Sequence, residues 1–465
     1  MLEIAYFKRT LFFIVVTLII WLITLRKPFV GVVYYQLFSM LMLQEVFQIL
    51  SPYHIPKITA LLTFIAWYFL KDKATKITIS KQTILMFAFL IVMCLSSINN
   101  GHEPWQVFSI TFFFKLVIAH LLIINLINNQ QKLWIFAIVL PIAAADLATI
   151  ANLEGTISPY SWMNKNHFGE MLVGSVAFAG MFAFREKKIL IKLFWVAIVL
   201  TIFYGEIRSM SRGAFVGFTI SICLLFMLNF NVRNFLILLV LGGIVVARTN
   251  QKYINRIETI FKFEEVDTAQ QRMGTASAGI KMFKANPFLG VGPDQFMNNF
   301  SLYASYEDQL KVGGNIGHEK IKPHNTFVQA ATENGIIGFI LFLLILYFTF
   351  TDVSRIRRVL PKDNLIRIIS EAAGISIIGL LVTGLTQDST HSLQLYTLVS
   401  LIVACRNLVE NSMLKQFQIT PNKILLSNLP LQEDNVVRPW FQFIYKHQFL
   451  FLFFLFLLCT YISKP

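Results

Sequence analysis

Charge is scarce in this chain. Only 14% of its 465 residues are Asp, Glu, Lys or Arg, whereas a soluble globular domain carries about 25%. Apolar residues make up 56% of the sequence, and phenylalanine alone occupies 45 positions. A chain of this composition has too few charged side chains to cover a water-soluble surface. The scarcity of charge therefore indicates that most of the protein lies in a lipid bilayer.

Cysteine is also scarce, and its positions form no pattern. The chain has no CxxC pair, and no His, Cys or Asp cluster has the spacing of metal ligands, so we expect neither a metal nor a cofactor. We expect buried, inert thiols at the four cysteines, which are Cys94, Cys223, Cys405 and Cys459. The net charge of +15 falls largely in short loops, without a basic stripe of interleaved aromatic residues, and this argues against nucleic acid as a partner.

Long apolar runs are abundant. A bilayer core needs about 20 apolar residues per helix, and backbone groups in lipid must be paired within their own segment. We therefore predict an all-α polytopic membrane protein with about 12–14 transmembrane helices. Arg26 and Lys27 follow the first run (11–25) in place of a small-residue cleavage site, which predicts an uncleaved first span. Further runs lie at 29–50, 57–70, 83–98, 106–126, 133–153, 168–184 and 189–207.

Lysine and arginine in short loops predict the orientation of the spans, because they favour the cytoplasmic side. The segment 352–367 is the most basic short loop, and the basic loops at 71–81 and 185–188 fall on its side. Four segments then lie on the opposite face, at 99–105, 154–167, 204–212 and in a large loop at 248–324. The N-terminal runs do not fit this parity as full spans, so we expect one of them to be short or re-entrant.

The chain divides into four predicted parts. Residues 1–247 form N-terminal transmembrane helices, and residues 248–324 form the large loop. Residues 325–406 form C-terminal transmembrane helices, and residues 407–465 combine a cytoplasmic segment with an extra apolar span at 441–461. The loop is predicted to be partly helical, with a helix over 271–285 that ends at Asn286 and Pro287.

Two arginines stand at the outer end of a predicted span. Arg208 and Arg212 are four residues apart, so on a helix they share a face. Guanidinium groups match phosphate oxygens in a bidentate fork, which makes both residues candidates for phosphate binding. An alternative is that they extend to the interface or pair with Glu206. Gly213 and Gly217 form a small-xxx-small pair that predicts close packing of a neighbouring helix.

The end of the large loop contains a candidate general base. His324 precedes a predicted helix, and its unperturbed pKa near neutrality suits proton transfer; alternatively it caps the helix beside Asn325. The glycines at 290 and 292 indicate a plain turn, because no strand precedes them and no helix follows. Intramembrane ionisable residues either line a cavity or pair with one another, and the sequence does not rank them: Lys115, His120, Asp146 and Glu170.

Four segments occur in a recognisable order along residues 164–403. They are 211–214 (Ser-Arg-Gly-Ala) at the start of a span, Arg272 in the large loop, 286–292 (Asn-Pro-Phe-Leu-Gly-Val-Gly), and His324-Asn325 followed by 333–335 (Glu-Asn-Gly). This order resembles the O-antigen ligase and Wzy-type polymerase family of bacterial envelope glycosyltransferases. The segment 27–31 near the start is also similar to members of this group.

The resemblance implies a metal-independent inverting glycosyltransferase of GT-C-like architecture. It would be a multi-pass protein of the bacterial inner membrane, with its active site facing the periplasm and its large loop there. The donor would be a glycan on undecaprenyl pyrophosphate. An O-antigen ligase, with a lipopolysaccharide core as acceptor, is our first expectation. A polysaccharide polymerase and a protein O-oligosaccharyltransferase are alternatives from the same family.

The family pattern also implies roles for individual residues. Carried over to this chain, the catalytic residues are Arg212, Arg272 and His324. We further expect contacts to the pyrophosphate or the glycan from Arg208, Ser211, Asn325 and Asn166. An alternative of another class is a transporter of lipid-linked saccharides, but the sequence has no internal repeat and no broken helices in matched positions.

Overall fold

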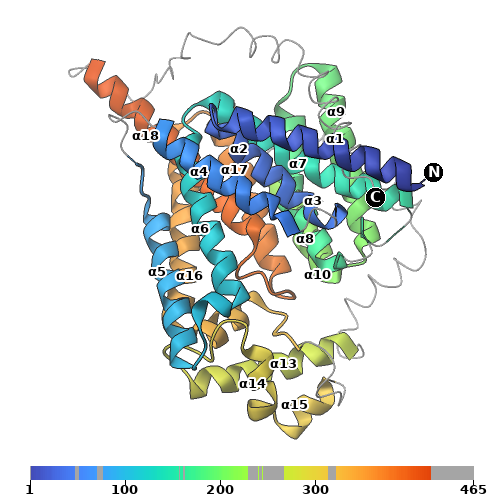
Figure 1. The fold of residues 1–465 in the computed structure, drawn as a ribbon, viewed down its shortest axis with the longest axis vertical. Coiled ribbons are helices and arrows are strands. Elements are labelled where there is room, and N and C mark those ends of the chain that lie inside the picture. The colour runs from blue at the N-terminus through green and yellow to red at the C-terminus, as the bar shows by residue number, and fades with distance from the viewer. Residues whose placement is uncertain are drawn as a thin grey trace.

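A computed structural model describes residues 2–47, 52–70, 77–154, 156, 158–160, 163–228, 239, 243, 267–312 and 321–419. Within these ranges the chain forms helices and turns and no strand (Figure 1). Among the described residues, eight helices are long and apolar enough to cross a membrane, which confirms the all-α polytopic prediction. They are α5 (Lys81–Asn99), α6 (Phe108–Leu126), α7 (Gln130–Glu154), α8 (Lys165–Arg185), α9 (Ile189–Ser209), α16 (Thr326–Val359), α17 (Leu365–Thr383) and α18 (Leu393–Ile419).

Shorter apolar helices accompany these spans. α4 (Ile55–Leu70) and α10 (Arg212–Leu228) are apolar but fall short of 18 residues. α1 (Leu2–Thr24) precedes them at the N-terminus. The predicted extra span at 441–461 and the first part of the large loop lie outside the described residues. The predicted total of 12–14 spans therefore remains a prediction.

The apolar run at 29–50 is not one transmembrane helix, so this part of the sequence prediction is wrong. α2 (Pro28–Met40) ends after 13 residues, Met42 adopts a left-handed φ of 48°, and α3 (Leu43–Val46) is a single turn. A 13-residue helix is about 20 Å long, shorter than the roughly 30 Å bilayer core. The expectation that one early run is short is confirmed.

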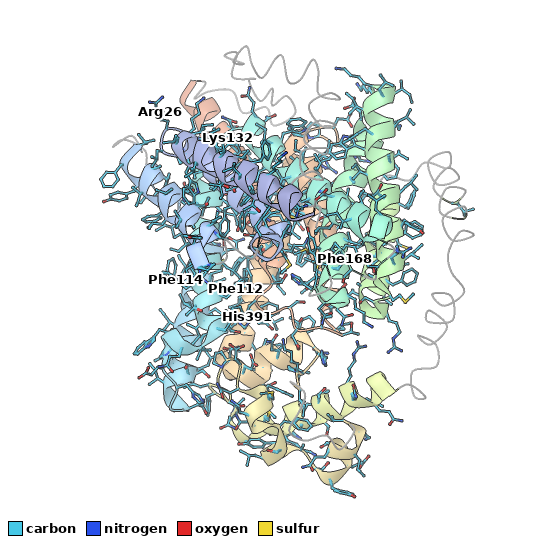
Figure 2. The ribbon with its side chains drawn as sticks, turned by 45° about the vertical axis from the view of Figure 1, so that its right-hand side comes forward. Arg26, Phe112, Phe114, Lys132, Phe168 and His391 are labelled. Atoms are coloured by element: carbon cyan, nitrogen blue, oxygen red, sulfur yellow. The ribbon has the colours of Figure 1, made fainter. Side chains whose placement is uncertain are left out.

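Ion pairs gather the basic loops at one end of the molecule. Arg185 pairs with Asp363 at 2.7 Å, which joins the end of α8 to the α16–α17 connection. Arg406 pairs with Asp352 at 3.3 Å on the same side. Arg26 and Lys132 also lie at the end away from α13–α15 (Figure 2). The basic segments at 185–188 and 352–367 therefore share one face, as their charge predicted, whereas residues 71–76 of the third basic loop lie outside the described residues.

The described part of the large loop lies at the other end (Figure 1). It contains α13 (Asp267–Ala285), α14 (Phe296–Tyr303) and α15 (Tyr306–Lys311). Its own small apolar core consists of Ala278, Met282, Val291, Phe296 and Phe300. The prediction of a partly helical loop is confirmed, and the predicted helix over 271–285 ends before Asn286 and Pro287.

A backbone break in α16 anchors this loop. Gly335 has φ 64° and ψ −170°, a conformation that is essentially restricted to glycine. The break frees carbonyl groups that an unbroken helix would use internally. The N–H of Val291 donates to Thr332 O at 2.9 Å, and the N–H of Gly292 donates to Glu333 O at 3.1 Å. The N–H of Ile336 in turn donates to Pro287 O at 2.7 Å.

The segment 286–292 is therefore a structural joint built from backbone hydrogen bonds. α5 joins the same contact, because Ser96 Oγ donates to Leu289 O at 2.5 Å and to Glu333 O at 3.0 Å. Asn100 Nδ2 donates to Gly290 O at 3.2 Å. These bonds confirm a turn and leave its carbonyl and N–H groups engaged with protein. The joint holds α13 in place over the ends of α5 and α16.

Gly335→Ala is predicted to destabilise the folded protein. A Cβ at Gly335 would overlap the backbone of Phe288, and the positive φ alone costs about 1–3 kcal/mol for a non-glycine residue. We expect a lower melting temperature of the purified protein in detergent. Gly101→Ala is the matched control, because Gly101 has φ 76° but open space within 4 Å of its Cβ position. Equal melting temperatures for the two variants would contradict the joint.

Candidate active site

The first candidate residue, Arg212, begins α10 after a tight turn. α9 ends at Ser209, and Met210 has a left-handed φ of 51°. Ser211 Oγ accepts from the N–H of Ala214 at 3.4 Å, so Ser211 caps the new helix in the way its residue type favours. The local sequence therefore fixes Arg212 at a helix start, where backbone N–H groups favour anions.

Gly213 and Gly217 bring α10 against the end of α17, as their spacing predicted. A Cβ at Gly213 would overlap the side chain of Thr386, and a Cβ at Gly217 would meet Thr383 and the carbonyl of Gly379. Larger residues at either glycine would push the two segments apart. The consequence is that Arg212 lies beside the 384–392 connection between α17 and α18.

The same connection is fastened to the start of α16 through Thr326. The N–H of Thr326 donates to Gly384 O at 2.7 Å, and its hydroxyl donates to Gln387 O at 2.9 Å. The N–H of Ser389 donates to Thr326 Oγ1 at 3.0 Å, and Thr390 Oγ1 donates to Thr326 O at 3.1 Å. Four hydrogen bonds on one residue thus fix the 384–392 connection against the residues that precede α16.

His324 and Asp388 meet across this contact. His324 Nδ1 lies 3.7 Å from Asp388 Oδ2, and the backbone N–H groups of His324 and Asn325 hydrogen-bond to the same carboxyl. His324 has a left-handed φ of 47°. Its side chain is 43% exposed, whereas that of Asp388 is 11% exposed. The largely buried carboxyl therefore lies next to a partly exposed imidazole, which remains accessible for proton transfer.

Arg272 reaches the same place from the large loop. Thr275 Oγ1, one turn further along α13, donates to Pro323 O at 3.3 Å and so ties α13 to the residue before His324. Burial lowers the pKa of the Arg272 guanidinium, Arg212 lowers it further, and Asp388 opposes both effects. These electrostatic interactions show that two guanidiniums and a carboxylate, from three separate parts of the chain, share one neighbourhood.

The surroundings keep His324 unprotonated at neutral pH. Burial lowers its pKa below the ordinary 6.5, Asp388 opposes this effect, and the positive charges of Arg272 and Lys322 add to it. Burial raises the pKa of Asp388, and His324 and Lys322 oppose that rise. A neutral imidazole beside a carboxyl is the form that a general base needs before it accepts a proton.

The remaining predicted contact residues have protein partners in this structure. Asn325 Oδ1 caps α16 by accepting from Phe327 and Val328 at 2.9 and 3.1 Å. Arg208 Nε donates to Thr156 O at 3.3 Å, and its guanidinium lies 5.9 Å from the Tyr204 ring centroid. The N–H of Asn166 donates to the side chain of Asn164 at 2.8 Å at the start of α8. Whether these three residues and Ser211 contact a substrate remains a prediction.

A cavity of about 850 Å³ is lined in part by Asp388, the carboxyl that lies next to His324. Its walls come from α2, α4, α6, α8 and α18, and they are mostly apolar. Asp388, Lys322 and His391 line one part of it, and burial lowers the pKa of His391 to about 4. Figure 2 shows Phe112 and His391 in the middle of the molecule, between the α1–α4 region and the α13–α15 end.

Some of the intramembrane ionisable residues that the sequence left unranked line this cavity, and others do not. Lys115 and Glu170 line it, and Glu170 Oε2 lies 3.7 Å from His167 Nδ1. His120 instead bonds within the core, to Thr83 Oγ1 at 2.9 Å and Ser400 Oγ at 2.8 Å. Asp146 is fully buried in α7. Two of the four residues therefore face a space that a ligand can enter.

Asp388 and Lys322 are the site residues that sequence reasoning missed. The available signal was the polar stretch 386–391, which interrupts two apolar runs on the side of the large loop. Among the described residues, no group of three or more His, Cys, Asp or Glu side chains could hold a metal ion. The side chains present can bind an anionic group through two guanidiniums and remove a proton through one imidazole.

Comparison with known proteins points to the same region. Residues 196–343 match the family described as O-antigen ligase, a stretch that includes Arg212, Arg272 and His324. The chain is also 29% identical over 127 residues to the exopolysaccharide production protein ExoQ of Rhizobium meliloti (strain 1021). That alignment covers 27% of this chain and 28% of ExoQ. The match over residues 196–343 supports the O-antigen ligase and Wzy-type polymerase family, as the order of the four sequence segments predicted.

Proposed function

We propose that this protein is a glycosyltransferase that moves a glycan from undecaprenyl pyrophosphate to an acceptor hydroxyl. The single observation that carries the proposal is that Arg272 interacts electrostatically with both Arg212 and Asp388, while Asp388 lies 3.7 Å from His324. The reaction would take place at the membrane face that carries α13–α15, which we assign to the periplasm of a bacterial inner membrane. The match to the O-antigen ligase family supports this chemistry.

In the proposed reaction the bond between the anomeric carbon and the pyrophosphate oxygen breaks. The acceptor oxygen attacks the opposite face of that carbon, so a single displacement inverts its configuration. Negative charge grows on the departing pyrophosphate, and Arg212 and Arg272 would stabilise it as preorganised donors without a metal. His324 Nε2 would take the proton from the acceptor hydroxyl, and Asp388 would stabilise the resulting imidazolium.

The cavity supports a lipid-linked substrate. Its polar part at Lys322, Asp388 and His391 lies next to the proposed chemistry, and its apolar walls between the helices suit a hydrocarbon chain. This arrangement would keep the hydrocarbon tail of one lipid-linked substrate in an apolar environment while the saccharide attached to it reaches His324.

The acceptor distinguishes two versions of the proposal. Transfer onto a lipopolysaccharide core is the O-antigen ligase version, which was our first expectation from the sequence. Extension of a polysaccharide on a second lipid-linked repeat is the polymerase version. The similarity to a protein named for exopolysaccharide production favours the second version, within the 127 aligned residues.

Purified protein incubated with glycan on undecaprenyl pyrophosphate tests the reaction itself. We expect undecaprenyl pyrophosphate to be released only when an acceptor glycan is present, with a new glycosidic bond of inverted configuration in the product. Mass spectrometry and nuclear magnetic resonance of the product measure both. Movement of the lipid across a vesicle bilayer with its glycan still attached would instead support a transporter.

Substitutions in the three central residues should stop transfer while leaving insertion into the membrane intact. We expect a loss of about 100-fold or more in rate for Arg212→Ala and Arg272→Ala, as for the removal of a preorganised transition-state donor. For His324→Ala we expect a loss of about 10²- to 10⁴-fold. Arg212→Lys should recover little, because an ammonium lacks the guanidinium fork.

Arg185→Ala serves as the matched control, since Arg185 pairs with Asp363 at the opposite end of the molecule. The measurement is the initial rate of transfer by protein whose amount and monodispersity have been verified. Full activity in all three alanine variants would show that the chemistry lies elsewhere.

The pH dependence of transfer should report His324. The transfer rate should be highest above the pKa of His324, which lies below the ordinary 6.5. It should fall as the pH drops through this pKa, because the imidazole becomes protonated. Asp388→Asn removes a charge that favours the imidazolium, so the acid limb should move to lower pH. Lys322→Gln removes a charge that opposes the imidazolium, so the limb should move to higher pH. Identical profiles for both variants would exclude His324 as the titrating base.

A further inference from the structure

A second group of cations lines the cavity away from Arg212 and Arg272. Lys57 comes from the first turn of α4 and Lys115 from α6, and His54 precedes α4. Lys115 is seven residues into α6, about 10 Å from the helix start at the α13–α15 end of the molecule. A lysine at that depth in a membrane protein is costly unless it faces a cavity or binds a partner.

The two lysines have no carboxylate partner among the side chains that the structure describes. Their ammonium groups are close enough to repel each other electrostatically. The acids that line the cavity are engaged elsewhere: Glu170 with His167 at 3.7 Å, Asp294 with Ser109 at 2.5 and 2.8 Å, and Asp388 with His324 at 3.7 Å. Two neighbouring positive charges in a mostly apolar wall favour an anionic ligand.

The cavity walls around the two lysines are mostly apolar, as expected for a site that binds a lipid. On α6 the cavity-lining residues are apolar except for Ser109 and Lys115: Phe108, Ser109, Phe112, Phe114, Lys115, Ile118, Ala119, Leu122 and Ile123. On α4 the lining residues after Lys57 are Ala60, Leu61, Thr63 and Phe64. A ligand that fits both faces has one compact negative charge and a long hydrocarbon chain, which describes the phosphate end of a lipid.

The same cavity leads from these lysines to the proposed chemistry. Lys57 and Lys115 line it together with Lys322, Asp388 and His391. A lipid phosphate held by the lysines would therefore direct a saccharide attached to it toward His324. The donor pyrophosphate would occupy Arg212 and Arg272, so the two phosphate positions are separate.

We propose that Lys57 and Lys115 bind the phosphate of the acceptor's polyprenyl anchor, which makes the acceptor a lipid-phosphate-linked saccharide and the reaction a chain extension. The inference rests on the proposed glycan transfer, which it deepens by naming the class of acceptor. Lysine suits this position, because its ammonium is a flexible point charge that holds a phosphate without fixing its orientation.

Native mass spectrometry of the full-length protein, titrated with undecaprenyl phosphate, tests the proposal. We expect two bound molecules for the wild type and one for the variant with both Lys57→Gln and Lys115→Gln. The lost site should weaken by about tenfold or more, as expected for removing charge-assisted hydrogen bonds. The variant with Lys57→Arg and Lys115→Arg should bind two. Lys132→Gln is the matched control and should bind two, since Lys132 lies at the far end of the molecule (Figure 2).

Transfer kinetics supply a second readout. The double glutamine variant should raise KM for a lipid-linked acceptor by about tenfold or more and leave KM for the donor unchanged. Arg212→Ala combined with Arg272→Ala should keep one bound undecaprenyl phosphate, at the lysines. If the double arginine variant transfers glycan at the wild-type rate, the proposed function is wrong. The number of undecaprenyl phosphate molecules bound by the double glutamine variant tests the lysine site separately.

Three outcomes would overturn the proposal. The first is unchanged binding and unchanged KM for the acceptor in the double glutamine variant. The second is equal or tighter binding of phosphatidylglycerol at the lysines, which would make them a site for bilayer lipid. The third is a preference for lipid A over undecaprenyl phosphate, which would assign the site to a lipopolysaccharide acceptor and favour a ligase.

Discussion

Asp388 is a largely buried carboxylate among cations that arrive from separate parts of the chain. It lies 3.7 Å from His324, and it acts electrostatically on Arg272, which also interacts with Arg212. Without this negative charge, the guanidiniums would repel one another and the imidazole would have no charged group to orient it. The carboxylate lets positive charge collect at one place before a substrate is bound. A pyrophosphate then meets donors that are already positioned, which is the condition for electrostatic catalysis without reorganisation.

The scaffold around Asp388 consists mainly of backbone and hydroxyl hydrogen bonds. Thr326 fastens the 384–392 connection to the start of α16, and Gly213 lets α10 approach it closely. Further along α16, the break at Gly335 accepts the segment 286–292 and so positions α13 with Arg272. Residues nearly two hundred positions apart are thus held by a few local features. Each of these features is a small or polar residue at a place where a larger apolar residue would not fit.

Much of the architecture could be predicted from the sequence, because hydrophobic length and loop charge determine it directly. The spans from 83 to 207, the helix over 271–285 and the gathering of basic loops on one face followed from these properties. The run at 29–50 was predicted wrongly, since an apolar run indicates burial but does not require one continuous helix. Met42 interrupts that run with a left-handed backbone that its residue type does not signal.

The candidate site was predictable only in part. Arg212, Arg272 and His324 followed from the order of family segments, but Asp388 did not, because its importance depends on a contact between residues 324 and 388 that no local pattern encodes. Gly335 belonged to a recognised segment, yet its role as a helix break requires the fold. Lys115 remained unranked among the intramembrane charges until the cavity placed it beside Lys57. The local sequence pattern identified the charged residues, but only the three-dimensional structure shows which of them lie close together.

The most direct test of the central claim is an electron cryomicroscopy structure of the full-length protein with undecaprenyl pyrophosphate bound. The account predicts a diphosphate contacted by both Arg212 and Arg272, with His324 on the side from which an acceptor would approach. A bound diphosphate that leaves these two guanidiniums uncontacted, or that lies at the opposite membrane face, would contradict it.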